Sequence, residues 1–407
     1  MRDVDLAIVG AGPAGAATAL GALAADPGLR VVMIDRSDFP RDKSCGDGIA
    51  PHVLDLLAEV GVEHLFDDRV PVSRLRLVRD GQDVERVMAR PAWVVPRRVF
   101  DARLVAAAQG AGAELLRHRV RTVRPARAGL ELDDVLSARV VVGADGAHSV
   151  VRRGLGQPTG PRALALRGYA PTTASRAGAQ VITFATVRQP AYAWSFDRGD
   201  GLANVGYGEL LQHGSAPPTR ALLLRRLEEL LPGATEGGSD WVGHHLPLST
   251  ASWRPPTGPV LLVGDAAGLV NPMTGEGIFY AVATGLAAGR AAAAAIAEDD
   301  PASAGRRFSR ETRPLLARHL RHTALASRLT RSGPLLRAGL RASARHQGVF
   351  DDLVELGLAR GRITPRLVGG LVTSLVTFPT NPTNSTNSTN PADPADPRRP
   401  AHRFEER

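Results

Sequence analysis

Short aliphatic runs alternate with helical patterns at both ends of the chain. The runs "LAIVG" (6–10) and "VVMID" (31–35) are typical of buried strands, and an Ala-rich helical pattern lies between them. Segments 138–153 and 258–297 repeat the order of strand, glycine-containing turn and helix. Strand-like segments dominate the chain between these parts. The pattern predicts an α/β fold with a sheet-rich part threaded through it.

This order predicts discontinuous domains. The expected bounds are 1–72, 98–161 and 255–300 for a Rossmann-like dinucleotide-binding domain, 73–97 and 162–254 for an interleaved α+β substrate domain, and 301–378 for a C-terminal helical region. From about residue 73 we expect short strands, among them "ERVMA" (85–89) and "AWVVP" (92–96), and strand-like segments dominate from about 162 to 250. The polar, Pro-rich repeats of 379–407 predict a disordered tail.

Three glycines follow the first strand in the spacing of a dinucleotide fingerprint. Gly10, Gly12 and Gly15 allow a tight turn, close approach of a pyrophosphate, and close packing of helix on strand. The helix that follows presents free N–H groups to the phosphates. Asp35 ends the second strand, twenty residues beyond Gly15, where it can accept hydrogen bonds from a ribose. An acid there disfavours a 2′-phosphate, so the expected ligand is FAD or NAD.

The net charge of +9 is concentrated in one region. Residues 306–345 contain eleven Arg and one acid, Glu311. This region is either a solvated arginine-rich face or a surface for an anionic membrane. Aromatic residues make up only 4% of the chain and no zinc-ligand cluster is present, which argues against nucleic acid and against a metal site. We see neither a signal peptide nor a spanning helix, and Cys45 is the only cysteine, so we expect a cytoplasmic protein.

Four motifs together resemble the geranylgeranyl reductase family, within the para-hydroxybenzoate-hydroxylase-like FAD-dependent oxidoreductases. They are "GAGPAG", "FPRDKSCGDG", "VGADGAHSVVRR" and "GDAAGLVNPMTGEGI", and the resemblance runs from about residue 4 to about 375. It implies tightly bound FAD. The residues that it assigns to FAD are Gly10, Gly12, Gly15 and Ala16 (pyrophosphate), Asp35 and Arg36 (adenosine), Arg97 with Arg98 as its rival (phosphates), Val120 (adenine), Asp145, Asp265 (ribityl chain), and Gly277 and Ile278 (pyrimidine edge).

The resemblance places the loop "PRDKSCGDG" (40–48) beside the isoalloxazine, with Cys45, Gly46 and Gly48 in contact with the cofactor. Glycines allow the backbone to approach a flat ring. Cys45 is the catalytic candidate, as a thiol that shapes substrate position or flavin redox behaviour; the alternative is a small buried apolar residue. Lys43 either offsets cofactor charge or faces solvent. Asp47 and His52 are further candidate proton donors.

A strand of alternating aromatic residues, "YAWSFD" (192–197), resembles the strand that covers the substrate cavity in the family. Trp194 and Phe196 project to one face, toward either the core or the cavity. Asp197 stands where the family usually has proline.

The expected activity is reduction of C=C bonds in a geranylgeranyl or menaquinone-like polyprenyl chain by hydride from reduced flavin. The alternative is a monooxygenase that hydroxylates or epoxidises an indole, terpenoid or aromatic natural product through a C4a-hydroperoxyflavin, and a third class is a lipid or quinone carrier with structural FAD. NAD(P)H or a ferredoxin-like donor would visit transiently, because no second dinucleotide fingerprint is present. The expected partner is a hydrophobic lipid substrate, with peripheral membrane contact through 306–345.

Overall fold

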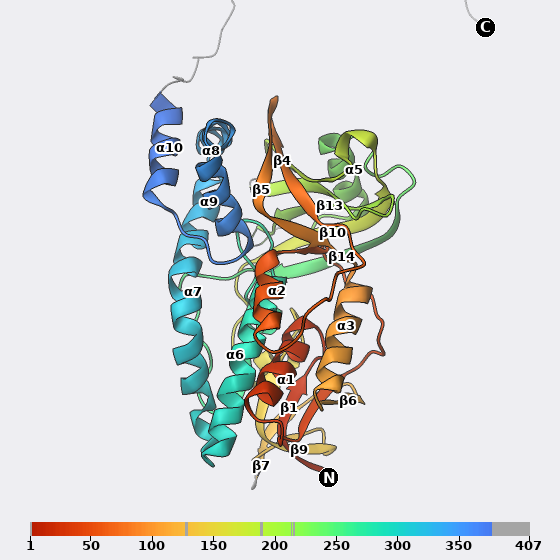
Figure 1. Cartoon of the computed structure of the whole chain (residues 1–407), viewed down its shortest axis with the longest axis vertical. Helices are drawn as coiled ribbons and strands as arrows, with labels where there is room; N and C mark the ends of the chain where they lie inside the picture. The colour runs from red at the N-terminus through yellow and green to blue at the C-terminus, as the bar shows by residue number, and fades with distance from the viewer. Residues whose placement is uncertain (1, 127–128, 188–189, 213, 215, 377–407) are drawn as a thin grey trace, which may run out of the picture.

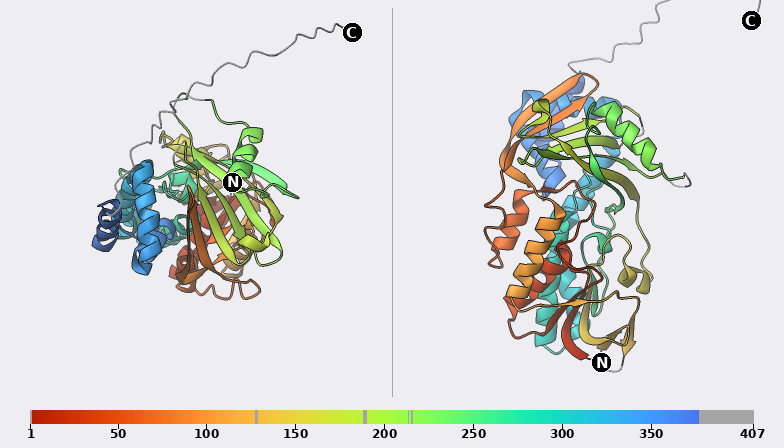
Figure 2. Two further views of the ribbon diagram at one scale, coloured as in Figure 1. Left: turned by 90° about the horizontal axis from the view of Figure 1, so that it is seen from above. Right: turned by 90° about the vertical axis from the view of Figure 1, so that its right-hand side faces the viewer.

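The two β-sheets lie toward opposite ends of the long axis of the molecule, and the C-terminal helices run along one side of it (Figures 1 and 2). The computed structural model describes residues 2–126, 129–187, 190–212, 214 and 216–376. The tail that we expect to be disordered, 379–407, lies outside them. The α/β class is confirmed, whereas the domain bounds given above stay a prediction.

The first sheet has the strand order β6-β2-β1-β9-β8-β7, and β15 pairs with β9. Its parallel strands are the aliphatic runs of the sequence: β1 (Arg2–Val9), β2 (Val31–Asp35), β6 (Glu114–Arg117), β9 (Leu136–Gly143) and β15 (Val260–Leu262). The antiparallel hairpin β7 (Val123–Ala126) and β8 (Gly129–Leu132) extends it. Aliphatic side chains fill β1 and β2 because helices cover a parallel sheet.

Helix α1 (Pro13–Ala25) packs against α6 (Ile278–Ala297) almost backbone to backbone. A Cβ on Gly21 would lie 2.5 Å from the Leu286 carbonyl oxygen, and one on Gly289 would lie 2.2 Å from that of Thr18. Only glycine permits this approach, which fixes the start of α6 relative to the glycine turn after β1. Helix α6 is long and apolar enough to cross a membrane, but 89% of that window is buried inside the protein, as in a core helix.

The second sheet has the strand order β14-β10-β13-β12-β11-β4-β5-β3. Its strands are β3 (Gly48–Ile49), β4 (Val72–Arg79), β5 (Gln82–Val94), β10 (Arg162–Pro171), β11 (Ala179–Phe184), β12 (Ala191–Asp197), β13 (Leu202–Leu210) and β14 (Ser239–Pro247). Helix α5 (Arg220–Leu230) packs on β10, β12 and β13 through Leu223 and Leu227.

One expectation for this part of the chain is wrong. "ERVMA" and "AWVVP" do not form separate strands, because β5 runs through both and past Pro91. The ladder with β4 shifts register there, between the pairs Val72–Ala92 and Arg74–Val87, so the missing N–H of Pro91 costs no ladder bond. Strands dominate 162–254 as expected, and "RALLLRRLEEL", for which no helix was expected, forms the amphipathic helix α5 between β13 and β14.

The expected C-terminal helical region is present. It contains α7 (Ala304–Leu329), α8 (Gly333–Arg345), α9 (Gln347–Leu358) and α10 (Pro365–Val376). Helix α7 runs beside α6, and α8 and α9 pack on β5 of the second sheet (Figure 1). The remaining short helices are α2 (Pro51–Ala58), α3 (Arg97–Gly110), α4 (Val150–Gly154), and the 3₁₀ turns η1 (Ala174–Arg176), η2 (Gly264–Ala267) and η3 (Pro301–Ser303).

Candidate active site

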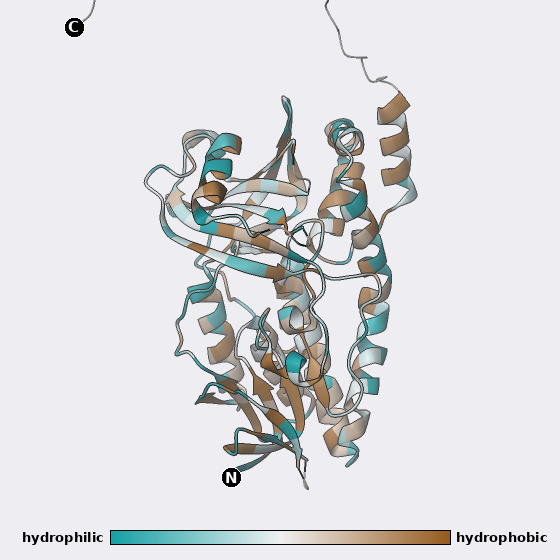
Figure 3. Ribbon diagram, turned by 180° about the vertical axis from the view of Figure 1, so that it is seen from behind, coloured by the Kyte–Doolittle hydropathy of each residue, from teal (hydrophilic) through white to brown (hydrophobic). Residues whose placement is uncertain are grey.

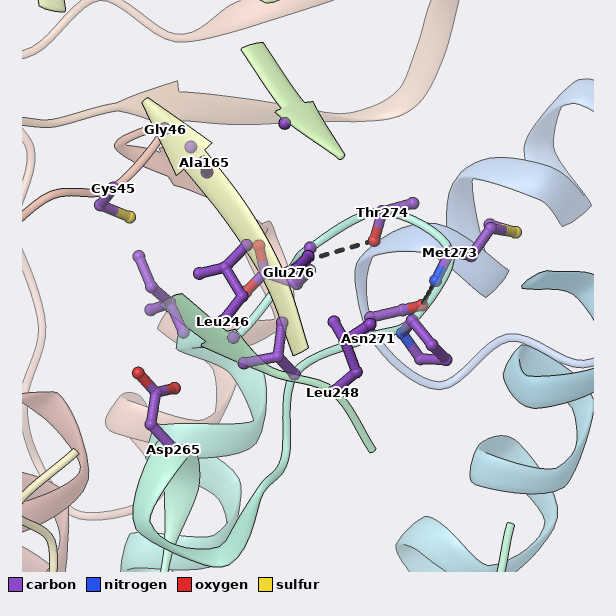
Figure 4. A pocket seen from close by; sticks show the side chains of 18 of the residues that line it. Cys45, Gly46, Ala165, Leu246, Leu248, Asp265, Asn271, Met273, Thr274 and Glu276 are labelled. Carbon is purple, nitrogen blue, oxygen red and sulfur yellow. Dashed lines mark hydrogen bonds between the residues drawn. The ribbon is translucent and has the colours of Figure 1, made fainter. Parts of the chain in front are cut away.

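A continuous cavity of about 1390 Å³ joins the glycine turn after β1 to the C-terminal helices. It passes the loop 40–48, the start of α6 and the inner face of the second sheet. Figure 4 shows Cys45, Asp265 and Glu276 around its middle, with Leu246 and Leu248 of the β14 region between them. Its size exceeds that of a site for one drug-sized ligand, which suits a large cofactor and a substrate together.

The glycine turn lines one end of the cavity through Gly10 and Gly12. Gly10 has φ +100°, and a Cβ there would lie 2.4 Å from the Ala144 carbonyl oxygen. Gly15 and Ala16 do not line the cavity. A Cβ on Gly15 would lie 1.9 Å from the Gly10 carbonyl oxygen, so Gly15 serves the packing of helix on turn, and Ala16 is fully buried.

Asp35 lies at the end of β2, at the cavity wall beside Arg36. Its carboxylate accepts hydrogen bonds from the backbone N–H groups of Ala11 and Ser37, both at 2.9 Å. These bonds hold the carboxylate at the wall, where a ribose hydroxyl can reach it. Val120, in the segment after β6, lines the same end.

Arg97 is buried at the start of α3 and lines the cavity. Its guanidinium donates two hydrogen bonds to Asp101, at 2.6 and 2.8 Å, and lies 3.9 Å from a Cβ placed on Gly12. Arg41 lies 3.3 Å from the same Cβ position. Arg98 is exposed and outside the cavity, so the geometry favours Arg97 of the two rivals. Two cations thus face the open side of the glycine turn, where a pyrophosphate needs them.

Asp145, after β9, lines the cavity and caps α4 by accepting a hydrogen bond from the Val150 N–H at 2.6 Å. Its other oxygen, Oδ1, is buried and has no hydrogen-bond partner among the described residues. Burial raises the pKa of Asp145. A buried acceptor without a partner at a cavity wall fits a ligand that donates a hydrogen bond.

Asp265 lies in η2 and forms an ion pair with Lys43, whose Nζ is 3.1 Å from Oδ2. Burial, the largest single influence, raises the pKa of Asp265, but Lys43 and the other positive groups nearby together bring the net pKa below the ordinary value. Lys43 therefore compensates a site carboxylate rather than facing solvent. Gly277 and Ile278 line the cavity at the first turn of α6, where free N–H groups point out of the helix.

These features fit FAD. The open glycine turn with Arg97 and Arg41, the acceptors of Asp35 and Asp145, and the start of α6 lie along one elongated cavity. Of the residues that the resemblance assigns to FAD, all but Gly15, Ala16 and Arg98 line it. The assignments themselves stay a prediction.

The cysteine loop is tied to the second sheet by a buried hydrogen-bond network. The Asn204 amide donates to the Cys45 carbonyl oxygen at 2.8 Å and to Asp47 Oδ2 at 2.9 Å, and accepts from Trp194 Nε1 at 2.8 Å. Tyr169 also donates to Asp47 Oδ2, at 2.6 Å. Asp47 is fully buried with φ +59°, a backbone conformation that needs such support. These bonds thus fix the Cys45 backbone to the second sheet.

Cys45 and Glu276 are two protonatable groups that line the cavity (Figure 4). Burial raises the pKa of the Cys45 thiol, so it stays protonated at neutral pH. Burial also raises the pKa of Glu276, to about 7, although its carboxylate accepts a hydrogen bond from the Phe279 N–H at 2.8 Å. The other candidate proton donors, Asp47 and His52, do not line the cavity. His52 instead lies 3.1 Å from Glu355 of α9.

Trp194 and Phe196 both line the cavity, which decides between the two orientations that the sequence left open. The Phe196 ring lies 3.5 Å from a Cβ placed on Gly46, so the aromatic strand packs directly over the cysteine loop. Asp197 points away and accepts hydrogen bonds from Thr172 Oγ1 and the Gly178 N–H. Its replacement of the family's proline therefore leaves the cavity lining unchanged.

Sequence reasoning missed several contributors to the cavity and its network: Arg41, Tyr192, Asn204, His244, Glu276 and the helices α7–α10. The sequence could have indicated Glu276, because it is the acid between the two glycines of "GEGI". It could also have indicated Tyr192, which shares the alternating spacing of the aromatic strand. It could not have indicated Asn204, because its partner Cys45 is 159 residues away.

His244 of β14 also lines the cavity, close to the Lys43–Asp265 pair. Its Nε2 is buried without a partner among the described residues. Burial and the Lys43 charge lower the pKa of His244 to about 4, so the ring is neutral at neutral pH. The histidine therefore adds no positive charge beside Asp265.

Comparison with known proteins agrees with this site. The FAD binding domain family matches residues 3–323. The chain is 36% identical to the menaquinone reductase of Mycolicibacterium smegmatis over 312 residues, 69% of this chain and 74% of that one. It is 33% identical to digeranylgeranylglycerophospholipid reductase 2 of Methanopyrus kandleri over 326 residues, 73% and 79% of the two chains.

Solved structures share the fold. A geranylgeranyl bacteriochlorophyll reductase-like protein of Thermoplasma acidophilum has a TM-score of 0.71 at 21% identity, over 92% of this chain and 96% of that one. The OxyS anhydrotetracycline hydroxylase of Streptomyces rimosus has a TM-score of 0.63 at 22% identity, over 87% and 76%. The fold alone therefore does not separate reductases from hydroxylases.

Fold, cavity and family match define an FAD-dependent oxidoreductase. Within that class, the chain belongs to the FAD-binding family that contains the menaquinone and digeranylgeranylglycerophospholipid reductases, the geranylgeranyl reductase family.

Proposed function

We propose that this protein reduces C=C bonds in the polyprenyl chain of an isoprenoid lipid. The observation that carries the proposal is the aliphatic end of the cavity, beyond Cys45 and Trp194. It is lined from β4, β5, β11 and α7–α10, by side chains that include Leu75, Leu77, Met88, Ile182, Leu336, Leu340, Phe350, Leu353, Val354, Leu367 and Leu371. Burial of a hydrocarbon chain there is favourable by ~0.8 kcal/mol per CH₂. The names of the relatives at 36% and 33% identity support the same substrate class.

Bound FAD would supply the hydride, and the chain's own groups would hold and orient it. Arg97, Arg41 and the start of α1 would bind the pyrophosphate, and the N–H groups at Gly277 and Ile278 would face the pyrimidine edge. Saturating a double bond also consumes a proton. The Cys45 thiol is protonated at neutral pH and faces the same cavity as Glu276. We assign Cys45 the catalytic role at the reacting bond.

We further propose that the reducing equivalents come from a transient donor, NAD(P)H or a ferredoxin-like protein. The sequence holds one dinucleotide fingerprint, and its Gly10 and Gly12 already line the cavity described above. A donor that visits and leaves is consistent with that single fingerprint.

We propose a cytoplasmic location with peripheral membrane contact, because a polyprenyl lipid resides in a bilayer. The arginine-rich region 306–345 supplies the charge for contact with anionic lipid.

Anaerobic turnover tests the proposed function. The holoenzyme, reduced chemically, is mixed with a detergent-dispersed menaquinone or geranylgeranyl lipid, and products are analysed by mass spectrometry. The expected product gains mass in steps of two hydrogens without oxygen. A product that forms only in air and gains one oxygen atom would instead identify a monooxygenase, and no product in either atmosphere would contradict both activities.

A further inference from the structure

The aliphatic end of the cavity reaches the surface between the end of α7 and α10. Leu325 and Leu329 of α7 are 48% and 37% exposed, and Val368 and Val372 of α10 are 47% and 53% exposed, yet all four line the cavity. Val376, at the end of α10, is 77% exposed and lies outside the cavity. Figure 3 shows that α10 is hydrophobic along most of its length. We call these five residues the portal lip.

Exposed arginines accompany the portal lip. Arg321 and Arg328 lie four residues before Leu325 and three after it, on the same face of α7, and Arg331 follows in the next turn. None of the three has a carboxylate within 4.0 Å in the part of the chain that the structure describes. Residues 312–350 contain eight arginines and no acid. Arg321, Arg328 and Arg331 therefore carry positive charge that no carboxylate of the described residues pairs with at this end of α7.

The other end of α7 differs. Arg306 pairs with Asp300 at 3.5 Å, Arg307 pairs with Glu298, and Glu311 pairs with Arg290 of α6. Local acids thus neutralise much of the charge near the start of the helix. The region 306–345 is therefore not one uniform basic face: ion pairs with local acids gather near the start of α7, whereas Arg321, Arg328 and Arg331 beside the portal lip have no such pair among the described residues.

We propose that the portal lip docks on an anionic bilayer and that the polyprenyl tail enters the cavity there. The apolar side chains would lie at the acyl boundary, and Arg321, Arg328 and Arg331 would contact headgroup phosphates. This inference rests on the proposed function for the identity of the tail. It replaces docking by all of 306–345 with docking by one end of α7, together with α10.

A second copy of the chain is a poorer occupant. In a two-fold dimer across the portal lip, the same unpaired arginines of both copies would meet. Like charges oppose that contact, whereas the phosphates of an anionic bilayer complement it. The cavity also opens at the portal lip. A bilayer there could deliver the polyprenyl tail through this opening, whereas a dimer would block it.

Vesicle co-sedimentation of the holoenzyme tests the docking surface. Two matched double variants remove the same charge from the two ends of α7: Arg328→Gln with Arg331→Gln, and Arg306→Gln with Arg310→Gln. We expect vesicles of phosphatidylcholine with 30% phosphatidylglycerol to bind the wild type at least fivefold better than pure phosphatidylcholine vesicles do. The first pair should abolish that preference and the second should retain most of it. Equal losses in both pairs, or no binding of the wild type, would overturn the proposal.

The apolar contribution is tested with Val376→Asp, because Val376 does not line the cavity. We expect vesicle binding to fall at least fivefold, whereas Val135→Asp, at an exposed valine in the turn before β9, should bind as the wild type does. Turnover of detergent-dispersed lipid separates this inference from the proposed function. Val376→Asp should still turn over detergent-dispersed lipid but should no longer turn over lipid held in vesicles. A Val376→Asp variant that binds vesicles normally but dissociates a dimer in light scattering would assign the lip to a second copy.

Discussion

At the scale of single residues, Asn204 joins the second sheet to the loop 40–48 that contains Cys45. It is fully buried and bonds to Cys45, Asp47 and Trp194 at once. Replacing it with leucine of similar size would remove a hydrogen bond from each of the three groups and leave Asp47 Oδ2 only its bond from Tyr169. The cost is ~1–3 kcal/mol for each buried group left without a partner that water cannot reach. The effect on Cys45 should exceed the effect on FAD, because Asn204 does not line the cavity.

We therefore predict that Asn204→Leu retains FAD but frees the Cys45 loop. The thiol is the only one in the chain, so the rate of iodoacetamide incorporation reports Cys45 directly. We expect that rate to rise by about tenfold, with Tyr169→Phe intermediate because it removes one bond of the network. Asp197→Asn is the control, as a buried polar residue of the same sheet outside the network. An unchanged alkylation rate in Asn204→Leu would show that the network does not position the thiol.

Cys45 itself is predicted to act in turnover and not in cofactor binding. Cys45→Ala should bind FAD with an unchanged absorbance spectrum and lose about 10²-fold in kcat, the size expected for loss of a positioned proton donor. Cys45→Ser, which keeps a hydroxyl, should recover part of that loss. Single-turnover kinetics of the reduced holoenzyme measure the step. If Cys45→Ala turns over normally, the thiol is only a packing residue.

Asp47 should make stability depend on pH in a defined direction. Burial raises its pKa from 3.8 to about 6, despite the hydrogen bonds from Tyr169 and Asn204. Between these values the folded protein binds more protons than the unfolded chain, so the contribution of Asp47 to stability falls as pH rises through this window. Asp47→Asn cannot ionise. The Tm of the variant minus that of the wild type should therefore increase from pH 4 to pH 7, and a constant or decreasing difference would contradict the assignment.

At the scale of elements, the turn between β1 and α1 depends on one contact. A Cβ on Gly15 would lie 1.9 Å from the Gly10 carbonyl oxygen, a backbone atom that cannot yield without moving the turn. We predict that Gly15→Ala lowers the Tm by several degrees and loses FAD on purification. Gly110→Ala at the end of α3, where no atom lies within 4 Å of the added Cβ, should be neutral. Absorbance at 450 nm and calorimetry distinguish the two; FAD retained in Gly15→Ala would contradict the prediction.

An element can be predicted from the sequence when the residues that determine it are close together in the chain. The β1–α1–β2 unit follows from adjacent residues: the glycine spacing, the aliphatic runs and Asp35 at the end of a strand. Strand β5 does not, because whether Pro91 breaks a strand depends on a register shift in the partner β4. Helix α5 has a clear amphipathic pattern. It was not predicted as a helix because the segments on both sides of it are strand-like.

At the scale of the whole molecule, the cavity is assembled from parts that no local pattern connects. Loop 271–277 holds the start of α6 against the C-terminal helices, since Asn271 Nδ2 donates to the Leu356 and Gly357 carbonyl oxygens at 3.1 Å and Thr274 Oγ1 donates to Gly357 at 2.7 Å. The sequence motifs located the FAD end, where residue types report their chemistry. They could not locate the aliphatic end, because leucines and valines that line a cavity look like those of any core.

The length of the aliphatic end should limit the chain that the enzyme accepts. Gly339 of α8 lines this end, and a Cβ there would lie 3.7 Å from Leu371 Cδ2, an ordinary contact, so a side chain fits but extends into the space for substrate. We predict that Gly339→Leu raises KM for a long polyprenyl lipid by about tenfold or more, since displacing two or three methylenes forfeits ~2 kcal/mol. A short prenyl substrate and FAD binding should be unaffected. Gly369→Leu, on the outer side of α10 with open space around it, is the matched control. Equal effects on long and short chains would mean that the tail does not lie between α8 and α10, and the aliphatic end would then have to be read as packing space and not as the substrate site.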